Sequence, residues 1–198
     1  MSDKTQQLDP CKSHEALERA SREFFHTLCH AIGEEPTREG LIRTPERLST
    51  SLTQMLAGYA KDPKAALGAC FSESECDEMI VLKDLPFYSM CEHHLLPFFG
   101  SISLGYIPNQ QLVGISSLAR FVEVFTQRLQ IQERLTAQIA QTLMDELKPK
   151  GVMVVIRARH LCFEMRQGTS SEIITSALKG IFKNDSKTRA EFMRLVNG

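Results

Sequence analysis

The stretch MIVLKDLPFYSMCEHHLLPFFGSISLGYIP, residues 79–108, indicates the fold class of this 198-residue chain. Its first part, 79–90, and its last part, 98–108, carry the β-branched, aromatic and alternating residues that are typical of strands. A polar turn with the sequence CEHH, residues 91–94, lies between them. We therefore predict two strands with cysteine and histidine side chains at their connection.

Helical patterns lie on both sides of these strands. Apolar residues recur at three- and four-residue steps over 13–33 and again over 44–58. Beyond the strands, the pattern predicts helices over about 117–129 and 132–147, followed by a strand over 151–165. A short amphipathic helix is predicted at the C-terminus. The fold class is therefore α+β, in which N-terminal helices precede antiparallel strands that flank two central helices.

The chain divides by composition into three parts. Residues 1–12 are predicted to form a flexible tail, 13–78 an N-terminal helical region, and 79–198 the domain that carries the chemistry. The segment 171–182 has no clear pattern.

Composition excludes several functional classes. A hydrophobic content of 42% with 24% charged residues is typical of a folded protein rather than a disordered one. The net charge of −1 argues against a nucleic-acid partner, although it allows a local basic pocket for a small anion. No apolar run is long enough to cross a bilayer, and the polar N-terminus lacks a secretory signal, so we expect a cytoplasmic protein with no membrane partner. In that reducing compartment the six cysteines favour metal binding or burial over disulfides.

The CEHH turn suggests a metal site. Cys91 and His94 are three residues apart, and a thiolate with an imidazole suits zinc. Cys162 is a third candidate, and it shares a face with His160 if that strand stays regular. Three ligands with an open position would make a catalytic site, whereas a fourth ligand from His93 would make a structural one. A Cys-x-x-His pair on its own is more often buried without a metal. His93 and His160 are also suitable proton carriers.

A series of motifs resembles the GTP cyclohydrolase I family in order and spacing. They are CEHHLLPF at 91–98, YIP at 106–108, GISSLAR at 114–120, QERLT at 132–136 and HLC at 160–162. REGLIRTPER at 38–47 and KTRAEFMRLV at 187–196 are similar to the family's N-terminal signature and last helix. The resemblance covers nearly the whole chain after its first dozen residues.

The resemblance implies a tunnelling-fold (T-fold) subunit in a ring-shaped homodecamer with active sites at subunit interfaces. It implies conversion of GTP and water into formate and 7,8-dihydroneopterin triphosphate, the first step of folate and pterin synthesis. Zn²⁺ would be held by Cys91, His94 and Cys162, and a water activated by the ion would attack C8 of guanine. His160 and His93 would transfer protons during ring opening and deformylation.

The resemblance also implies a set of nucleotide-binding residues. Glu133 would hold guanine, because a carboxylate accepts two hydrogen bonds from the N1–H and 2-amino edge that adenine lacks. An acid in the first turn of a helix is also favoured by the helix dipole, without any ligand. Gln132 would lie beside the base. The phosphate contacts would come from Ser116, Arg120 and Arg166, with Arg47 as a further contact from a neighbouring subunit.

Two departures from the family pattern lie next to the residues expected to contact the phosphates. Ser117 stands where the family usually has lysine, and Arg166 is followed by Gln167–Thr169 and a shorter loop than the family usually has. These changes keep open a paralogue that acts on another guanine nucleotide or stops at a different product. A non-catalytic zinc-binding ring is a second alternative. The nitrile reductases of the tunnelling fold are disfavoured, since they use no zinc and would leave the CEHH and HLC motifs unexplained.

Overall fold

The computed structural model describes residues 10–72 and 77–198, with side chains from residue 14 onward. The chain forms two compact units, Met1–Leu56 and Ala57–Gly198. The predicted tail at 1–12 lies outside the described residues as far as residue 9, and a helix begins at Pro10. The assignment of the chemistry to residues 79–198 stays a prediction.

The smaller unit is a pair of packed helices. Helix α1 (Pro10–Ile32) packs against α2 (Thr44–Met55), which has a proline in its first turn. On α1, Ser21, Phe25 and Cys29 are buried at four-residue intervals. The apolar stripe beside them is exposed, and Phe24 is 60% exposed. The sequence pattern thus predicted the helix correctly, but much of its most apolar stripe is not covered within this unit.

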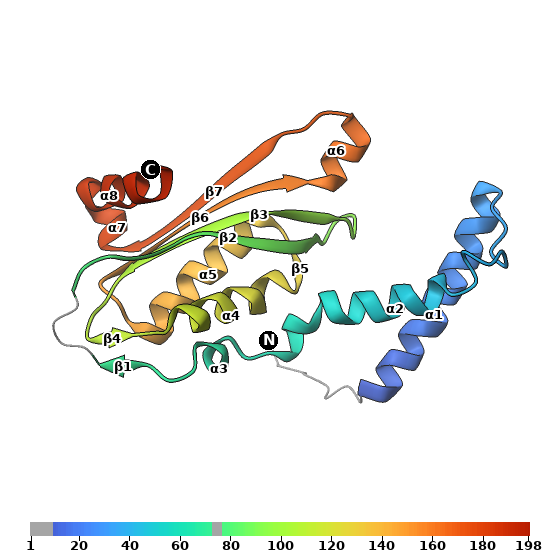
Figure 1. Ribbon diagram of the computed structural model, residues 1–198, viewed down its shortest axis with the longest axis horizontal. Coiled ribbons are helices and arrows are strands. Elements are labelled where there is room, and N and C mark those ends of the chain that lie inside the picture. The colour runs from blue at the N-terminus through green and yellow to red at the C-terminus, as the bar shows by residue number, and fades with distance from the viewer. Residues whose placement is uncertain (1–9, 73–76) are drawn as a thin grey trace, which may run out of the picture. The chain divides into compact units, whose positions relative to one another are not determined.

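The larger unit is built on a five-stranded sheet (Figure 1). Its strands lie in the order β5-β2-β3-β6-β7, and every pairing is antiparallel except that of β5 with β2. The strands span Ile80–Cys91 (β2), Pro97–Ile107 (β3), Leu129–Gln130 (β5), Gly151–His160 (β6) and Glu172–Gly180 (β7). A separate pair joins β1 (Phe71–Ser72) to β4 (Gln111–Leu112).

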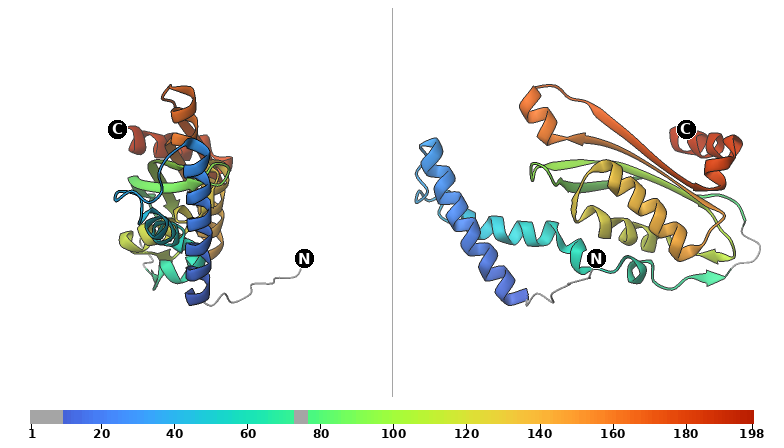
Figure 2. Two further views of the ribbon diagram at one scale, coloured as in Figure 1. Left: turned by 90° about the vertical axis from the view of Figure 1, so that its right-hand side faces the viewer. Right: turned by 180° about the vertical axis from the view of Figure 1, so that it is seen from behind.

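Helices cover both faces of the sheet. Figure 2, seen from behind, shows α4 (Ile115–Thr126) and α5 (Gln132–Leu147) together on one face, with the C-terminal helices on the other. The remaining helical segments are η1 (Ala57–Ala60), α3 (Pro63–Leu67), α6 (Leu161–Gln167), α7 (Ile181–Asn184) and α8 (Ser186–Asn197). Because β6 is covered on both faces, its sequence reads as a nearly continuous apolar run.

The core lies between the sheet and these helices. On the α4/α5 side it includes Ile102 and Leu104 of β3 and Leu135 and Ile139 of α5, all buried. On the other side, a smaller cluster forms around Phe182 and Phe192. The predicted α+β class and the predicted helix over 132–147 are confirmed.

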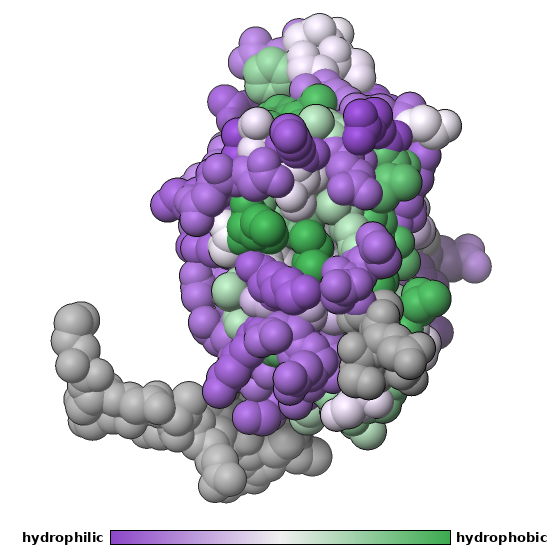
Figure 3. All heavy atoms as spheres, turned by 90° about the vertical axis from the view of Figure 1, so that its left-hand side faces the viewer, coloured by the Kyte–Doolittle hydropathy of each residue, from purple (hydrophilic) through white to green (hydrophobic). Residues whose placement is uncertain are grey.

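The face that Figure 3 shows is mostly hydrophilic, with smaller hydrophobic areas between. Within the described ranges, no helix is both long and apolar enough to span a membrane.

Two predictions about local structure are wrong, and one segment without a clear pattern is a strand. The strand from residue 151 ends at His160, and Cys162 lies on α6, so strand alternation does not place it. Leu, Glu, Met, Arg and Gln are good helix formers, which explains why 161–167 turns into helix. The segment 171–182, which has no clear pattern, contains the edge strand β7. The helix predicted to reach residue 129 ends at Thr126, where the chain turns into β5.

Candidate metal and catalytic site

The turn between β2 and β3 brings Cys91 and His94 together. The Cys91 N–H donates to the carbonyl of Leu96, and the Leu95 N–H donates to the carbonyl of Cys91, both at 2.9 Å. Leu95 has a φ of 51°, a left-handed conformation that is costly for a branched residue unless the surroundings enforce it. The tight turn leaves His94 Nδ1 at 3.8 Å from Cys91 Sγ.

Cys162 reaches the same place from the other side of β3. Phe98 of β3 pairs with His160 of β6, so the first turn of α6 starts beside the β2–β3 turn. One donor atom from each of Cys91, His94 and Cys162 lies within 4.8 Å of the other two. Two thiols and an imidazole are a donor set for a borderline-soft cation such as zinc. These three residues could therefore hold a metal ion.

Without a cation, the surroundings of Cys162 favour its neutral thiol. Both Cys91 and Cys162 are buried. Burial raises the pKa of the Cys162 thiol, and the neighbouring Cys91 thiol raises it further. A cation at this position would reverse both effects, because it stabilises thiolates.

His94 has a second partner, Arg166 of α6. The guanidinium Nη1 donates to His94 Nε2 at 3.0 Å, since arginine has no acceptor. A neutral imidazole that binds a metal through Nδ1 carries its hydrogen on Nε2, and one that binds through Nε2 uses that lone pair. In either case the ring cannot also accept from Arg166. Metal ligation by His94 and this hydrogen bond therefore exclude one another.

His160 ends β6 beside the cluster. Its ring stacks on Phe98 with centroids 4.7 Å apart and planes 7° from parallel. Its Nε2 lies 2.9 Å from Oε1 of Gln132. Burial lowers the pKa of His160, and the carboxylates of Glu133 and Glu164 offset part of that effect. The neutral imidazole is therefore favoured near neutral pH, as a group that accepts a proton requires.

Gln132 and Glu133 begin α5 but have different environments. Gln132 is 1% exposed, and its side-chain nitrogen lies within 3.0–3.2 Å of two carbonyl oxygens and a hydroxyl. Glu133 is exposed, and its charge acts on His160. Of these two neighbours, Glu133 is therefore the one whose side chain is accessible to a ligand.

His93 lies on the exposed side of the turn. Its Nε2 is 3.8 Å from a carboxylate oxygen of Glu92, which forms an ion pair with Arg134. The hydrogen bond from Arg134 lowers the pKa of Glu92 and so keeps the carboxylate charged. In the described part of the chain, His93 does not belong to the group of three possible metal ligands.

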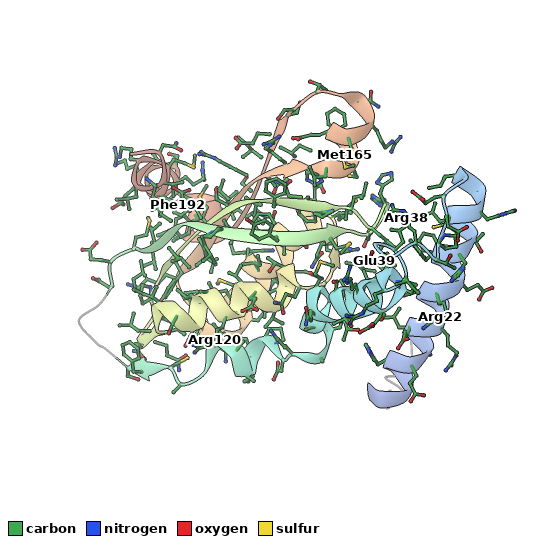
Figure 4. All side chains as sticks on the ribbon, turned by 45° about the vertical axis from the view of Figure 1, so that its right-hand side comes forward. Arg22, Arg38, Glu39, Arg120, Met165 and Phe192 are labelled. Atoms are coloured by element: carbon green, nitrogen blue, oxygen red, sulfur yellow. The ribbon has the colours of Figure 1, made fainter. Side chains whose placement is uncertain are left out.

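The predicted phosphate-binding residues fall into separate places. Ser116 is exposed in the first turn of α4, and the neighbouring Ser117 accepts a hydrogen bond from Arg120 Nη2 at 2.8 Å. Figure 4 shows Arg120 far from Met165, the residue before Arg166. Within a single chain, Arg120 therefore does not lie at the end of the sheet that carries Arg166. Arg47 is exposed on α2, in the smaller unit.

Two residues that pack beside this site had no separate signal in the sequence. Phe98 ends the CEHHLLPF motif, but its stacking on His160 depends on the register between β3 and β6. Thr175, which contacts Gln132, belongs to the strand that the sequence pattern does not define. Only the position of Phe98 within a motif could have singled it out.

Comparisons with known proteins agree with the motifs. The profile of the GTP cyclohydrolase I family matches residues 21–197. A protein of Helicobacter hepaticus named GTP cyclohydrolase 1 is 64% identical over 186 residues, which cover 93% of this chain and 90% of the relative. Proteins of the same name from Wolinella succinogenes and Helicobacter acinonychis are 53% and 52% identical, over 88% and 87% of this chain and 94% and 97% of theirs. An archaeosine synthase QueF-Like structure in the apo form is 16% identical with a TM-score of 0.37, over 53% of this chain and 96% of that one, which is too weak a likeness to carry an argument.

Proposed function

The chain belongs to the GTP cyclohydrolase I family, and we propose that it hydrolyses GTP to formate and 7,8-dihydroneopterin triphosphate, the first step of folate and pterin synthesis. The observation that carries this proposal is the cluster of Cys91, His94 and Cys162 with His160 beside it. A purely structural metal site would not require a stacked histidine of lowered pKa next to the ligands.

We propose that the resident metal is Zn²⁺, held by Cys91, His94 and Cys162. When bound, the ion supplies Lewis-acid activation of a water molecule at neutral pH. His94 must then release Arg166, because the ring cannot both bind a metal and accept from the guanidinium. Loading the site would therefore make the Arg166 cation available to an anionic substrate.

His160 and His93 are the proposed proton carriers. His160 is held in one plane by Phe98 and is largely neutral, so it can accept a proton and return it during ring opening and deformylation. His93 is exposed, with Nε2 3.8 Å from a carboxylate oxygen of Glu92, and an accessible imidazole can exchange protons with a substrate.

Glu133 is the residue that we propose reads the base. Its exposed carboxylate can accept from the N1–H and 2-amino groups of guanine and so reject adenine. Its position next to the buried Gln132 puts this recognition beside His160, where the imidazole ring of the purine must be opened.

For the triphosphate, we propose Ser116, Arg120, Arg166 and Arg47. Because Arg120 and the Arg166 end of the sheet are separated within one chain, a complete site needs residues from a second copy. Two surfaces that are exposed among the described residues support a homo-oligomer: the apolar stripe of α1 and the edge strand β7, on which Ile174 is 57% exposed. We propose the T-fold ring of ten subunits.

A second candidate is a paralogue that prefers another guanine nucleotide. It is favoured by Ser117, which lies buried against Arg120 where the family usually has a lysine for the phosphates. The two functions share the ring-opening chemistry and differ in how they bind the tail.

Incubation of the metal-loaded full chain with GTP, GDP, GMP and dGTP tests the proposal. Formate release and the fluorescence of the oxidised pterin should be followed separately. We expect both products from GTP. Formate without pterin, or a preference for another nucleotide, would favour the paralogue, and no formate from any nucleotide would contradict the proposed activity.

A further inference from the structure

The side-chain amide of Gln132 has its orientation fixed by the sheet. Its Nε2 lies 3.1 Å from the carbonyl oxygen of Ile156 and 3.0 Å from that of Ile173. It also lies 3.2 Å from the hydroxyl of Thr175. Carbonyl oxygens only accept hydrogen bonds, so the NH₂ end must face β6 and β7. A flipped amide would set its oxygen against two other oxygens inside the protein, where Gln132 is 1% exposed.

This orientation determines what Gln132 offers to His160. With the NH₂ group turned to the strands, Oε1 is the atom that faces His160 Nε2 at 2.9 Å. An amide oxygen only accepts, so Nε2 of His160 must be the donor and must carry a hydrogen. No hydrogen bond from the described residues engages Nδ1, which is then the nitrogen left for a reacting group.

A second contact fixes the plane of the same ring. Phe98 stacks on it at 4.7 Å between centroids, with 7° between planes. Stacking defines the plane of the imidazole, whereas the hydrogen bond to Gln132 defines which edge points into the protein. Together they leave one orientation, in which Nε2 faces α5.

We propose that Gln132 is a positioning residue for His160, which it holds with Nε2 as donor and Nδ1 available to the substrate. This inference rests on the proposed function and changes one part of it. Gln132 serves the reaction through the imidazole rather than through the base, and guanine is read by Glu133. Its four contacts occupy both polar atoms of the amide. A direct contact with the base would have to break one of them.

The kinetic test compares two variants of the zinc-loaded full chain. Gln132→Met keeps the length of the side chain but removes the acceptor for His160. We expect kcat for GTP to fall about 10- to 100-fold, as is typical when a supporting partner of a reactive group is lost, with KM and zinc content nearly unchanged. The matched control is Thr175→Val, which removes one partner of the NH₂ group but not the bond to His160. It should keep kcat near that of the wild type. A Gln132→Met variant with unchanged kcat and a raised KM would place the amide on the base and overturn the proposal.

The second test is spectroscopic and needs no turnover. In ¹⁵N-histidine-labelled zinc-loaded protein at about pH 8, where the neutral imidazole predominates, the His160 signals can be identified by their loss in His160→Ala. We expect the Nε2–H tautomer in the wild type and a mixture in Gln132→Met. The Nδ1–H tautomer in the wild type would overturn the proposal even if Gln132→Met does not fold. Because this readout is independent of activity, it separates a failure of the inference from a failure of the proposed function.

Discussion

Ser117 supports Arg120, and its removal should weaken the selection of the triphosphate. The hydroxyl accepts from Arg120 Nη2 at 2.8 Å, and Ser117 is only 9% exposed. Hydrogen bonds to charged groups contribute about 1.5–3 kcal/mol, and since Arg120 is exposed we expect solvent screening to reduce this to about 1 kcal/mol. That corresponds to roughly a fivefold change in an equilibrium constant. Ser117→Ala should therefore lower kcat/KM for GTP about fivefold and leave GMP nearly unchanged.

The assay measures kcat/KM for GTP, GDP and GMP with the wild type, Ser117→Ala and Ser117→Lys. The lysine variant loses the hydroxyl but adds a cation for the phosphates. We expect it to steepen the preference for GTP at low salt and to lose that gain at high salt, since salt screens a partly exposed charge. The deficit of Ser117→Ala should depend less on salt. A preference for GTP over GMP that is the same in all three proteins would refute the reasoning.

The metal ligands, the proton carrier and the base-reading residue give three further predictions. Cys162→Ala leaves two of the three ligands, so zinc content after dialysis should fall severely and activity with it; full zinc and full activity in this variant would remove Cys162 from the site. His160→Ala should slow turnover by about 10²–10⁴-fold while zinc content stays near that of the wild type, and a rate above half of the wild-type value would exclude it as a proton carrier. Glu133→Gln places an amide donor opposite the N1–H and 2-amino donors of guanine, which costs about 1–3 kcal/mol for each group left unpaired. KM for GTP should therefore rise strongly, while the zinc content stays unchanged. Unaltered kinetics in Glu133→Gln would mean that another group reads the base.

The strands and central helices were predictable because their patterns are local. Ile102 and Leu104 alternate with polar or small residues, and Leu135 and Ile139 recur at helical spacing, so each element shows its buried face in its own sequence. The pairing of Cys91 with His94 was predictable for the same reason, since both lie in one turn.

Features that depend on contacts between distant segments were not predictable from the pattern. Cys162 joins the cluster through the β3–β6 register and the start of α6, not through strand alternation. The contacts that occupy Gln132 come from β6 and β7, and β7 is an edge strand with few buried residues and therefore a weak signal. On α1, the apolar residues that make the helix recognisable are not all the ones that pack against α2; Phe24 is exposed and Phe25 is buried.

Zinc X-ray absorption of the purified full chain tests the central claim most directly. The claim is that Cys91, His94 and Cys162 form a metal site with one position left for the reaction. The proposed site predicts about one zinc per chain with two sulfur ligands, one imidazole and one light-atom ligand, as in catalytic zinc sites with three protein ligands. The sulfur signal should drop in Cys91→Ser. A shell of four protein ligands, or a protein that releases formate from GTP without any bound metal, would contradict the claim.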